Sequence, residues 1–349
     1  MRVLLDTSFA ARGPSGTGVY VERLAAALRE AGVEVVEAAH AQRRPPAGGG
    51  AGSVRNLASD TWWSGWRLGR RASAAGADVL HHPLPAFTVR PPCPQVVTVH
   101  DVAFARQPEL FARGYGAYAR RAHRFAARRA AVVVCVSHAT AADVVELWGV
   151  ASERIVVAHH GPGQETAPLA PRERKHFLYV GDDEPRKNLG LLLAGYRLYR
   201  AQRGGAALPL VLAGSAHARE PGVEVVDQPA EESLAELYAG AVALVHPARL
   251  EGFGMTPLEA MRAGTPVLAA RAAAVEEVCG EAAIYVDPDD PAALAAELGR
   301  LQDDPALRDR LSDAGHARAS RFSWEHAASA HMRAYTLAVD MSAPLPTGR

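Results

Sequence analysis

Short apolar segments alternate with helix-forming segments along almost the whole chain. Segments 3–5, 79–81, 96–100 and 132–137 are rich in apolar and β-branched residues, and helix-forming stretches rich in Ala, Leu and Arg separate several of them. Alternation of this kind is typical of a parallel sheet with helices on both faces, because each parallel crossover needs a connecting segment. The pattern therefore predicts an α/β protein built on doubly wound parallel sheets.

The alternation occurs twice. Residues 161–175 (GPGQETAPLAPRERK) concentrate Gly, Pro and polar residues, and strand-like segments resume at residue 177. Such a composition is typical of a domain boundary, and 349 residues can bury two cores. We therefore predict a first domain at 1–165, a second at 166–325 and a final amphipathic helix at 326–340. A ligand is expected in the cleft between the two halves.

Charge is unevenly distributed, although the whole chain is neutral. Residues 1–165 hold 19 Arg and no Lys against 13 acidic residues, a net +6, and residues 166–349 hold 19 Lys plus Arg against 25 acidic residues, a net −6. A basic half suits an anionic acceptor or a membrane surface, or it is only a solvated face. Three tryptophans of a predicted helix in this half could pack in the core or form a platform for an acceptor or a membrane: Trp62, Trp63 and Trp66.

Cysteine content and hydropathy indicate in which cellular compartment the protein is expected. The chain has three widely separated cysteines, a pattern that disfavours a disulfide framework or a zinc site and suits a reducing cytoplasm. No apolar run reaches the roughly 18 residues that cross a bilayer. The first residues, MRVLLDTSFA, are too polar for a signal peptide and resemble a strand. We expect a cytoplasmic protein that is at most peripheral to the inner face of the membrane.

Residues 246–267 (HPARLEGFGMTPLEAMRAGTPV) are the most informative for function. Glu251 and Glu259 flank a Gly-Phe-Gly turn between a strand-like run at 241–246 and a helix predicted at 256–263. A helix N-terminus attracts an anion such as a diphosphate, whereas carboxylates repel phosphate and accept hydrogen bonds from hydroxyls. The combination predicts a sugar-nucleotide site. Taken singly, Glu259 in a first helical turn could only complement the helix dipole, and Glu251 could be an exposed loop residue.

This stretch closely resembles the signature of retaining GT-B glycosyltransferases, specifically glycosyltransferase family 4. The resemblance implies two Rossmann-like domains that face a central cleft. It also implies that Glu251 contacts hydroxyls of the donor sugar and that Glu259 binds the nucleotide ribose. Residues 322–325 (FSWE) resemble the final motif of the family, after which a helix crosses back to the first domain. Backbone N–H groups expected to meet the sugar and diphosphate belong to Phe253, Gly254, Met255 and Thr256.

Positive charge for a diphosphate is predicted at residues 181–188 (GDDEPRKN), after the strand-like segment 177–180. Arg186 and Lys187 could stabilise a leaving nucleotide, or they could simply be charges at a helix start. The chain has just two lysines, and the string resembles the Glu-Pro-Arg-Lys-Asn motif of the family. The resemblance implies that Lys187, with Arg186, grips the donor diphosphate. Some members carry an additional Arg where Asp182 stands here, and Gly214, at the end of another strand, is expected near the nucleotide.

Two further strings of the first half resemble the same family. Residues 98–101 (TVHD), followed by Pro-Glu at 108–109, imply that His100 contacts the donor sugar, and Asp101 shapes the turn or touches the acceptor. The glycine-rich turn with Gly13, Gly16 and Gly18 implies a close approach of the backbone to diphosphate and acceptor. Read alone, a histidine at a strand end is a structural residue, and a glycine-rich turn is only a tight loop.

The resemblance extends from the first glycine turn to residue 324 and implies a reaction. A hexose, with mannose favoured, would move from an NDP-sugar, with GDP-mannose favoured over UDP- or dTDP-sugars, to a hydroxyl of a glycan, a lipid-linked sugar or a small molecule. Because Lys187 and Arg186 supply the positive charge, we expect no metal and no cofactor, and no nucleic-acid partner is implied. The adjacent His81 and His82 lack the spacing of metal ligands.

Alternative functions remain open from the sequence. Other chemistry on the same fold includes a nucleotide-sugar 2-epimerase and a sucrose- or trehalose-type synthase. A different class is a catalytically silent sugar-nucleotide-binding subunit of a glycan-assembly complex. The joint presence of Glu251, Glu259, Lys187 and His100 favours a catalyst over a silent subunit.

Overall fold

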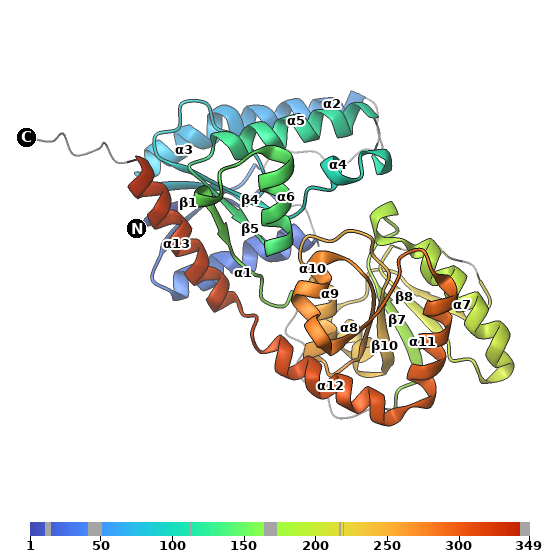
Figure 1. The fold of residues 1–349 in the computed structure, drawn as a ribbon. Coiled ribbons are helices and arrows are strands. Elements are labelled where there is room, and N and C mark those ends of the chain that lie inside the picture. The colour runs from blue at the N-terminus through green and yellow to red at the C-terminus, as the bar shows by residue number, and fades with distance from the viewer. Residues whose placement is uncertain are drawn as a thin grey trace, which may run out of the picture. The chain divides into compact units, whose positions relative to one another are not determined.

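The computed structural model divides the chain into two compact units (Figure 1). It describes residues 1–10, 15–40, 51–111, 113–163, 173–215, 218 and 220–342. The first unit is Met1–Gly161 together with the segment from Ser323 onward, and the second unit is Pro162–Phe322. These divisions lie a few residues before the boundaries predicted at 165 and 325. Gly13, most of the predicted linker and residues 41–50 lie outside the described residues.

The first unit contains a six-stranded parallel sheet in the order β2-β1-β3-β4-β5-β6. Leu5 pairs with both Glu37 of β2 and His81 of β3, so β1 is a central strand from which the chain winds in both directions. The strands are β1 (Arg2–Asp6), β2 (Glu34–Ala38), β3 (Val79–His82), β4 (Gln95–Val99), β5 (Val132–Cys135) and β6 (Ile155–Val157). The helices are α1 (Gly16–Glu30), α2 (Ala51–Trp62), α3 (Leu68–Ala75), α4 (Ala103–Arg106), α5 (Arg113–Arg129), α6 (His138–Trp148) and α13 (Trp324–Ser342).

Alternate residues of the strands fill two separate cores, one on each face of this sheet. Val132 and Val134 pack into a core with α1 and α13, whereas Val133 and Cys135 pack with α5 and α6 on the other face. Leu4 belongs to a third cluster, which α3 and Trp63 cover. This is the three-layer arrangement that the apolar strands predict, because strands covered on both faces are apolar on both faces.

Helix α13 comes last in the chain but completes the core of the first unit. Ala328, Ala334, Tyr335 and Ala338 are buried in the cluster that contains Tyr20 of α1. Small side chains on one face of α13 let it pack closely against α1 and against β5. The two ends of the chain therefore share one hydrophobic core.

The second unit has a six-stranded parallel sheet in the order β12-β11-β10-β7-β8-β9. In chain order this is the winding of a dinucleotide-type fold, with the direction reversing between β7 and β10. The strands are β7 (His176–Val180), β8 (Leu210–Ala213), β9 (Val223–Val226), β10 (Ala241–His246), β11 (Val267–Ala270) and β12 (Ala283–Val286). The helices are α7 (Leu189–Arg203), α8 (Glu231–Ala239), α9 (Met255–Arg262), α10 (Ala273–Cys279), α11 (Pro291–Asp303) and α12 (Pro305–Ala319).

Helices cover both faces of the second sheet (Figure 1). Phe177 and Tyr179 of β7 pack under α7 and α11 with Leu192, Tyr196 and Leu298 in one buried cluster. Gly195 lets these two helices approach closely, since a Cβ there would lie 2.5 Å from the Leu294 side chain. The α/β prediction is thus confirmed for both halves.

The predicted elements agree with the structure except at a few positions. Helix α1 begins at Gly16, with the Ser15 hydroxyl accepting from the amide of Gly18, so the glycine turn is shorter than predicted. Strand β6 and helices α4, α6 and α12 were not predicted. No helix of the described residues is both long enough and apolar enough to span a membrane.

Candidate functional site

The site of the second unit lies where the sheet reverses its winding direction. Strands β7 and β10 are adjacent and parallel, and Leu178 pairs with Leu244. The chain continues from β7 toward β8 and from β10 toward β11, so the two loops leave the sheet in opposite directions. A crevice forms at such a point beyond the carboxyl ends of the strands. Residues 181–188 follow β7, and residues 247–254 follow β10, which brings the predicted charged residues to one place.

Glu251 and Arg186 meet at this point. The Arg186 guanidinium donates from Nη1 to Oε2 of Glu251 at 3.0 Å and from Nε to Oε2 of Glu184 at 2.7 Å. The side chains of Glu251 and Arg186 retain 15% and 20% of their exposure, so the pair is mostly buried but still reachable. The amide of Arg249 donates to the Arg186 carbonyl oxygen at 2.9 Å, which fixes the two loops together.

The Glu251 carboxylate remains ionised despite its burial. Burial alone would raise its pKa, but the positive charges of Arg186 and Lys187 and the hydrogen bond from Arg186 lower it below the usual value for a glutamate. Its second oxygen, Oε1, lies 3.6 Å from Nε2 of His246. A charged acceptor of hydrogen bonds is therefore maintained at the crevice.

His246 is a site residue that the sequence analysis missed. It ends β10, is 4% exposed, and burial lowers its pKa to about 4, so the imidazole is neutral near pH 7. Among the described residues, Nε2 has no hydrogen-bond partner, because 3.6 Å to Glu251 is too long. A polar residue at the end of an apolar central strand was the available signal.

Lys187 lies at the end of a 3-10 turn (Pro185–Lys187) that follows β7. Its ammonium lies over Gly181: a Cβ at that glycine would be 2.6 Å from Nζ, and φ there is +147°. Within the part of the chain that the structure describes, no carboxylate lies within ion-pair distance of this ammonium. Its charge nevertheless contributes to lowering the pKa of both Asp182 and Glu251.

Gly214 ends β8 immediately beside the Lys187 loop. Its φ is +128°, and a Cβ there would collide with the carbonyl of Gly181, so only glycine fits. Asp182 accepts from the amide of Ser215 at 3.2 Å and from its hydroxyl, and these bonds lower the pKa of Asp182. Asp182 therefore connects two strand ends and has a structural role.

Glu259 lies one residue further into α9 than predicted. The helix begins at Met255 after Gly254, which caps it with φ +103°, so Glu259 is in the second turn rather than the first. The carboxylate is 7% exposed and accepts from the Tyr238 phenol at 2.9 Å. Thr256 stands in the first turn, where backbone N–H groups lack helical partners. The Phe253 ring packs on Phe322 at 5.7 Å, so only its backbone can serve a ligand.

His100 and Asp101 follow β4 in the first unit. The His100 ring donates from Nε2 to the Pro83 carbonyl at 3.0 Å and packs edge-on against Tyr20 at 4.7 Å. Burial lowers its pKa to about 4, so the ring is neutral near pH 7. Asp101 accepts from the amide of Ala103 at 2.9 Å, which is the turn-shaping role. Gly16 and Gly18 form the first turn of α1 rather than a loop.

A buried hydrogen-bond chain in the first unit was not predicted. His331 Nδ1 donates to the Ala327 carbonyl at 2.7 Å, which leaves Nε2 to accept from the Tyr20 phenol at 2.8 Å. Tyr20 in turn accepts from Thr98 at 2.8 Å. Thr98 accepts from His81 Nε2 at 2.9 Å, and His81 Nδ1 accepts from Tyr335 at 2.8 Å. The five side chains of this chain are all 0% exposed.

This series of hydrogen bonds joins α13 to α1, β3 and β4 through neutral side chains. The Ala327 carbonyl can only accept a hydrogen bond, so His331 must donate to it. This fixes which group donates and which accepts in every other hydrogen bond of the series. Burial lowers the pKa of His331 to about 4 and that of His81 well below its usual value. Tyr20 connects the chain to His100, because the two rings pack edge to face.

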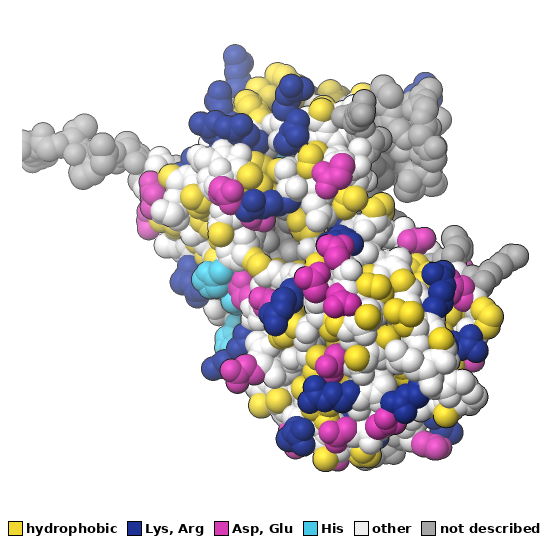
Figure 2. All heavy atoms as spheres, turned by 45° about the vertical axis from the view of Figure 1, so that its right-hand side comes forward, with side chains coloured by type: hydrophobic (Ala, Val, Ile, Leu, Met, Phe, Trp, Pro, Cys, Tyr) yellow, Lys and Arg dark blue, Asp and Glu magenta, His cyan; other side chains and the backbone are white. Residues whose placement is uncertain are grey.

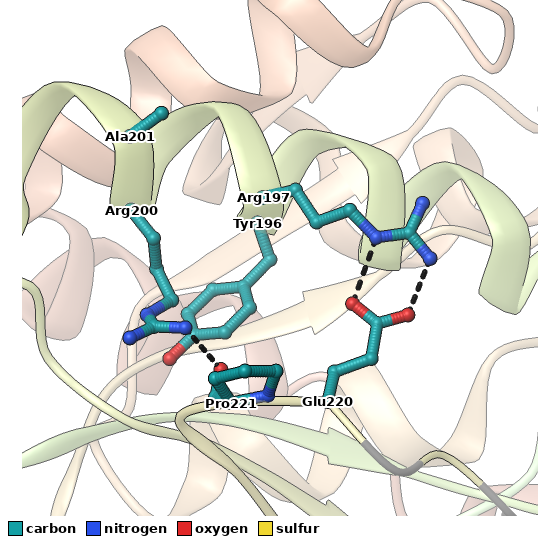
Figure 3. A pocket seen from close by; sticks show the side chains of 6 residues that line it. All are labelled: Tyr196, Arg197, Arg200, Ala201, Glu220 and Pro221. Atoms are coloured by element: carbon teal, nitrogen blue, oxygen red, sulfur yellow. Dashed lines mark hydrogen bonds and ion pairs between the residues drawn. The ribbon is translucent and has the colours of Figure 1, made fainter.

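A separate shallow pocket of about 590 Å³ lies between α7 and the segment before β9 (Figure 3). Its lining residues are Tyr196, Arg197, Arg200, Ala201, Glu220 and Pro221. Arg197 pairs with Glu220, and Arg200 donates to the Pro221 carbonyl. The Tyr196 phenol donates to carbonyls just before β8 and β9, so this pocket is at the amino edge of the sheet, opposite the crevice.

Family models match both units of the chain. The model described as Glycosyltransferase Family 4 matches residues 14–162, and the one described as Glycosyl transferases group 1 matches residues 164–318. The chain is 28% identical over 267 residues to O-antigen chain mannosyltransferase B of Escherichia coli. The aligned residues cover 69% of this chain and 70% of that protein. It is 26% identical over 333 residues to O-antigen chain mannosyltransferase RfbU of Salmonella typhimurium, covering 86% and 92%.

Solved structures show the same fold. The sucrose-phosphate synthase from Thermosynechococcus elongatus superposes with a TM-score of 0.75 at 20% identity, covering 96% of this chain and 98% of that one. At this identity the likeness concerns the fold alone: two Rossmann-like domains of the GT-B type.

Proposed function

Because the chain belongs to the group 1 glycosyltransferases and is a hexosyltransferase of the GT-B fold, we propose that it transfers mannose from GDP-mannose with retention of configuration. Two relatives that match most of the chain are named mannosyltransferases, which supports mannose over other hexoses. The observation that carries the proposal is the meeting of Arg186, Lys187 and Glu251 at the point where the second sheet reverses.

The cations of this site suit a departing diphosphate. When the bond between the anomeric carbon and phosphate oxygen breaks, negative charge grows on the diphosphate, and Lys187 and Arg186 stabilise it. Backbone N–H groups of the first turn of α9 at Met255 and Thr256 add partial positive charge. Since these groups supply the positive charge, the proposal includes no metal and no cofactor.

The carboxylates suit hydroxyls. Glu251, kept ionised by its cationic neighbours, accepts from a hydroxyl of the donor sugar. Glu259, held by Tyr238, accepts from the ribose. His100 is neutral near pH 7 and so serves a sugar hydroxyl as a hydrogen-bonding group rather than as a cation. In this scheme the acceptor hydroxyl attacks from the side that the diphosphate leaves, and the departing phosphate oxygen takes the proton of the hydroxyl.

The proposed acceptor is a glycan, a lipid-linked sugar or a small molecule. The enzyme itself is proposed to act in the cytoplasm and to attach peripherally to the membrane. The test begins with a panel of NDP-sugars, in which released nucleotide and transfer to extracts of lipids and small molecules are measured. Turnover with GDP-mannose and an α-linked product, read from one-bond C–H couplings by NMR, would support the proposal. A free 2-epimer would indicate an epimerase, and tight binding without turnover would indicate a silent binding subunit.

A further inference from the structure

Two neighbouring helical segments of the first unit expose large aromatic side chains. Trp62 and Trp66 are 53% and 54% exposed, and Phe125 and Tyr118 of α5 are 49% and 42% exposed. Trp63, between the two exposed tryptophans, is 5% exposed and already fills the core side of its helix. The exposed rings are thus additional to the packing that the fold requires: of the three tryptophans, Trp63 packs in the core, whereas Trp62 and Trp66 do not.

The two segments lie side by side. The Thr61 hydroxyl is 3.4 Å from the Tyr118 phenol, and Figure 1 shows α2 and α5 as neighbours. A π-helical turn (Trp63–Arg67) connects α2 to α3, and Trp62 and Trp66 are four residues apart in this helical segment. The guanidinium of Arg67 lies 5.1 Å from the centre of the Trp62 ring, and that of Arg129 lies 5.4 Å from the Phe125 ring. We call this surface, formed by residues 55–75 and 118–129, the arginine-aromatic face.

The arginine-aromatic face carries almost no negative charge. Residues 55–75 and 118–129 together contain nine Arg and one acidic residue, Asp60. Six exposed arginines of this face form no ion pair with any described acidic side chain: Arg70, Arg71, Arg120, Arg121, Arg124 and Arg128. Figure 2 shows Lys and Arg side chains gathered with apolar ones at the upper end of the view, where α5 lies in Figure 1.

We propose that the arginine-aromatic face binds the surface of a lipid bilayer that contains anionic lipids. Tryptophan, tyrosine and phenylalanine gain free energy when their rings enter the headgroup region, and arginines on the same face bind lipid phosphates. A soluble polyanion would attract the arginines but would leave the exposed rings in water. The proposal rests on the peripheral membrane attachment proposed above and assigns it to a surface. Its test uses neither donor nor acceptor, so its failure is distinguishable from a failure of the proposed glycosyl transfer.

The test is flotation of the full-length protein with vesicles of pure phosphatidylcholine and with vesicles that contain added phosphatidylglycerol. We expect binding to the anionic vesicles only, and release by salt, because the Debye length shortens. Replacing Arg120, Arg121, Arg124 and Arg128 by Gln should weaken binding about fivefold per arginine. The matched control replaces four exposed arginines of the second unit, Arg271, Arg300, Arg310 and Arg321, by Gln and should bind like the wild type.

A second measurement separates a bilayer from a soluble polyanion. Brominated lipid should quench tryptophan emission, and the double variant Trp62→Phe with Trp66→Phe should lose most of this quenching. Circular dichroism and thermal unfolding show whether each variant is folded. Equal vesicle binding by the four-arginine variant and its control would overturn the proposal. So would tight binding to heparin without quenching by brominated vesicles, which would indicate a polyanion partner instead.

Discussion

His246 Nε2 lies 3.6 Å from Oε1 of Glu251, while Arg186 binds the other oxygen of the same carboxylate. The two neighbours differ in charge, because burial keeps His246 neutral near pH 7 and Arg186 is a cation. Glu251 is thus hydrogen-bonded and ion-paired to Arg186, whereas the neutral His246 only lies near it. A donor diphosphate that attracts Arg186 would release the carboxylate for a sugar hydroxyl, and His246 would still face it.

Replacing Glu251 by Ala should abolish transfer and leave the affinity for the nucleoside diphosphate nearly intact. The reason is that the residue serves the sugar, and its loss leaves Arg186 available to phosphate. We expect a loss of at least about 100-fold in kcat, down to the limit of detection, measured with the donor found in the panel. Nucleotide affinity is followed by calorimetry. Glu184→Gln is the control, because it removes the other carboxylate of Arg186. An equal collapse of nucleotide binding would contradict the sugar role.

Replacing Lys187 by Met should weaken binding of the nucleoside diphosphate about tenfold or more, because the loss of a charge-assisted contact removes roughly 1.5–3 kcal/mol. Calorimetry with the diphosphate and with the bare nucleoside checks the origin of the loss, since only the diphosphate should be affected. Lys175→Met is a matched control: it removes the only other lysine, which pairs with Glu173 at the surface. Similar losses for nucleoside and diphosphate would exclude the phosphate role.

Tyr238→Phe should reduce discrimination between ribose and deoxyribose. The Tyr238 phenol holds the Glu259 carboxylate, and without it a buried charge lacks one hydrogen-bond donor, which costs about 1–3 kcal/mol of stability. We expect the affinity ratio of the nucleoside diphosphate to its 2′-deoxy form to shrink. Tyr196→Phe also removes a phenol that bonds to carbonyls, but at the opposite edge of the sheet, and should leave the ratio unchanged. An unaltered ratio in Tyr238→Phe would place the ribose elsewhere.

The first unit should lose stability as pH falls from about 6.5 to 4. Burial lowers the pKa of His331 to about 4, whereas an unfolded histidine titrates near 6.5. In this window the unfolded chain binds a proton that the folded chain excludes, so stability falls with falling pH, by about 2 kcal/mol at pH 5 for this residue. Urea unfolding at pH 7.5 and pH 5 measures the slope. His331→Gln should be less stable at pH 7.5 but show a smaller slope, and an unchanged slope would contradict the assignment.

The crevice residues could be predicted from local patterns. Glu251, Arg186 and Lys187 each follow an apolar strand, and the carboxyl ends of parallel strands meet at one edge of a sheet. The glycines around them could be recognised as well, although only the structure shows that Gly214 is required by the Gly181 carbonyl. His246 was missed because its strand was read as wholly apolar, although its last residue is a buried polar group at the crevice.

Other features depend on packing between distant segments, which a pattern of residues does not encode. Tyr20 and His331 are 311 positions apart, and their bond requires a definite register of α13 against α1. Similarly, Trp62 and Trp66 are exposed whereas Trp63 is buried, because the helical segment packs its Trp63 side on the core and turns its Trp62 and Trp66 side to the solvent. The apolar periodicity predicted a helix there but could not show which rings face the solvent.

The first unit has its last helix encoded after the whole of the second unit. During synthesis, Tyr20 and His81 are made early, yet His331 and Tyr335 leave the ribosome more than 240 residues later. Until then the apolar surface that α13 covers stays open to water and to other chains. The unit that stands first in the sequence is therefore completed last. Nascent chains must pass through a stage in which the second unit is able to fold while the hydrophobic core of the first unit still lacks α13.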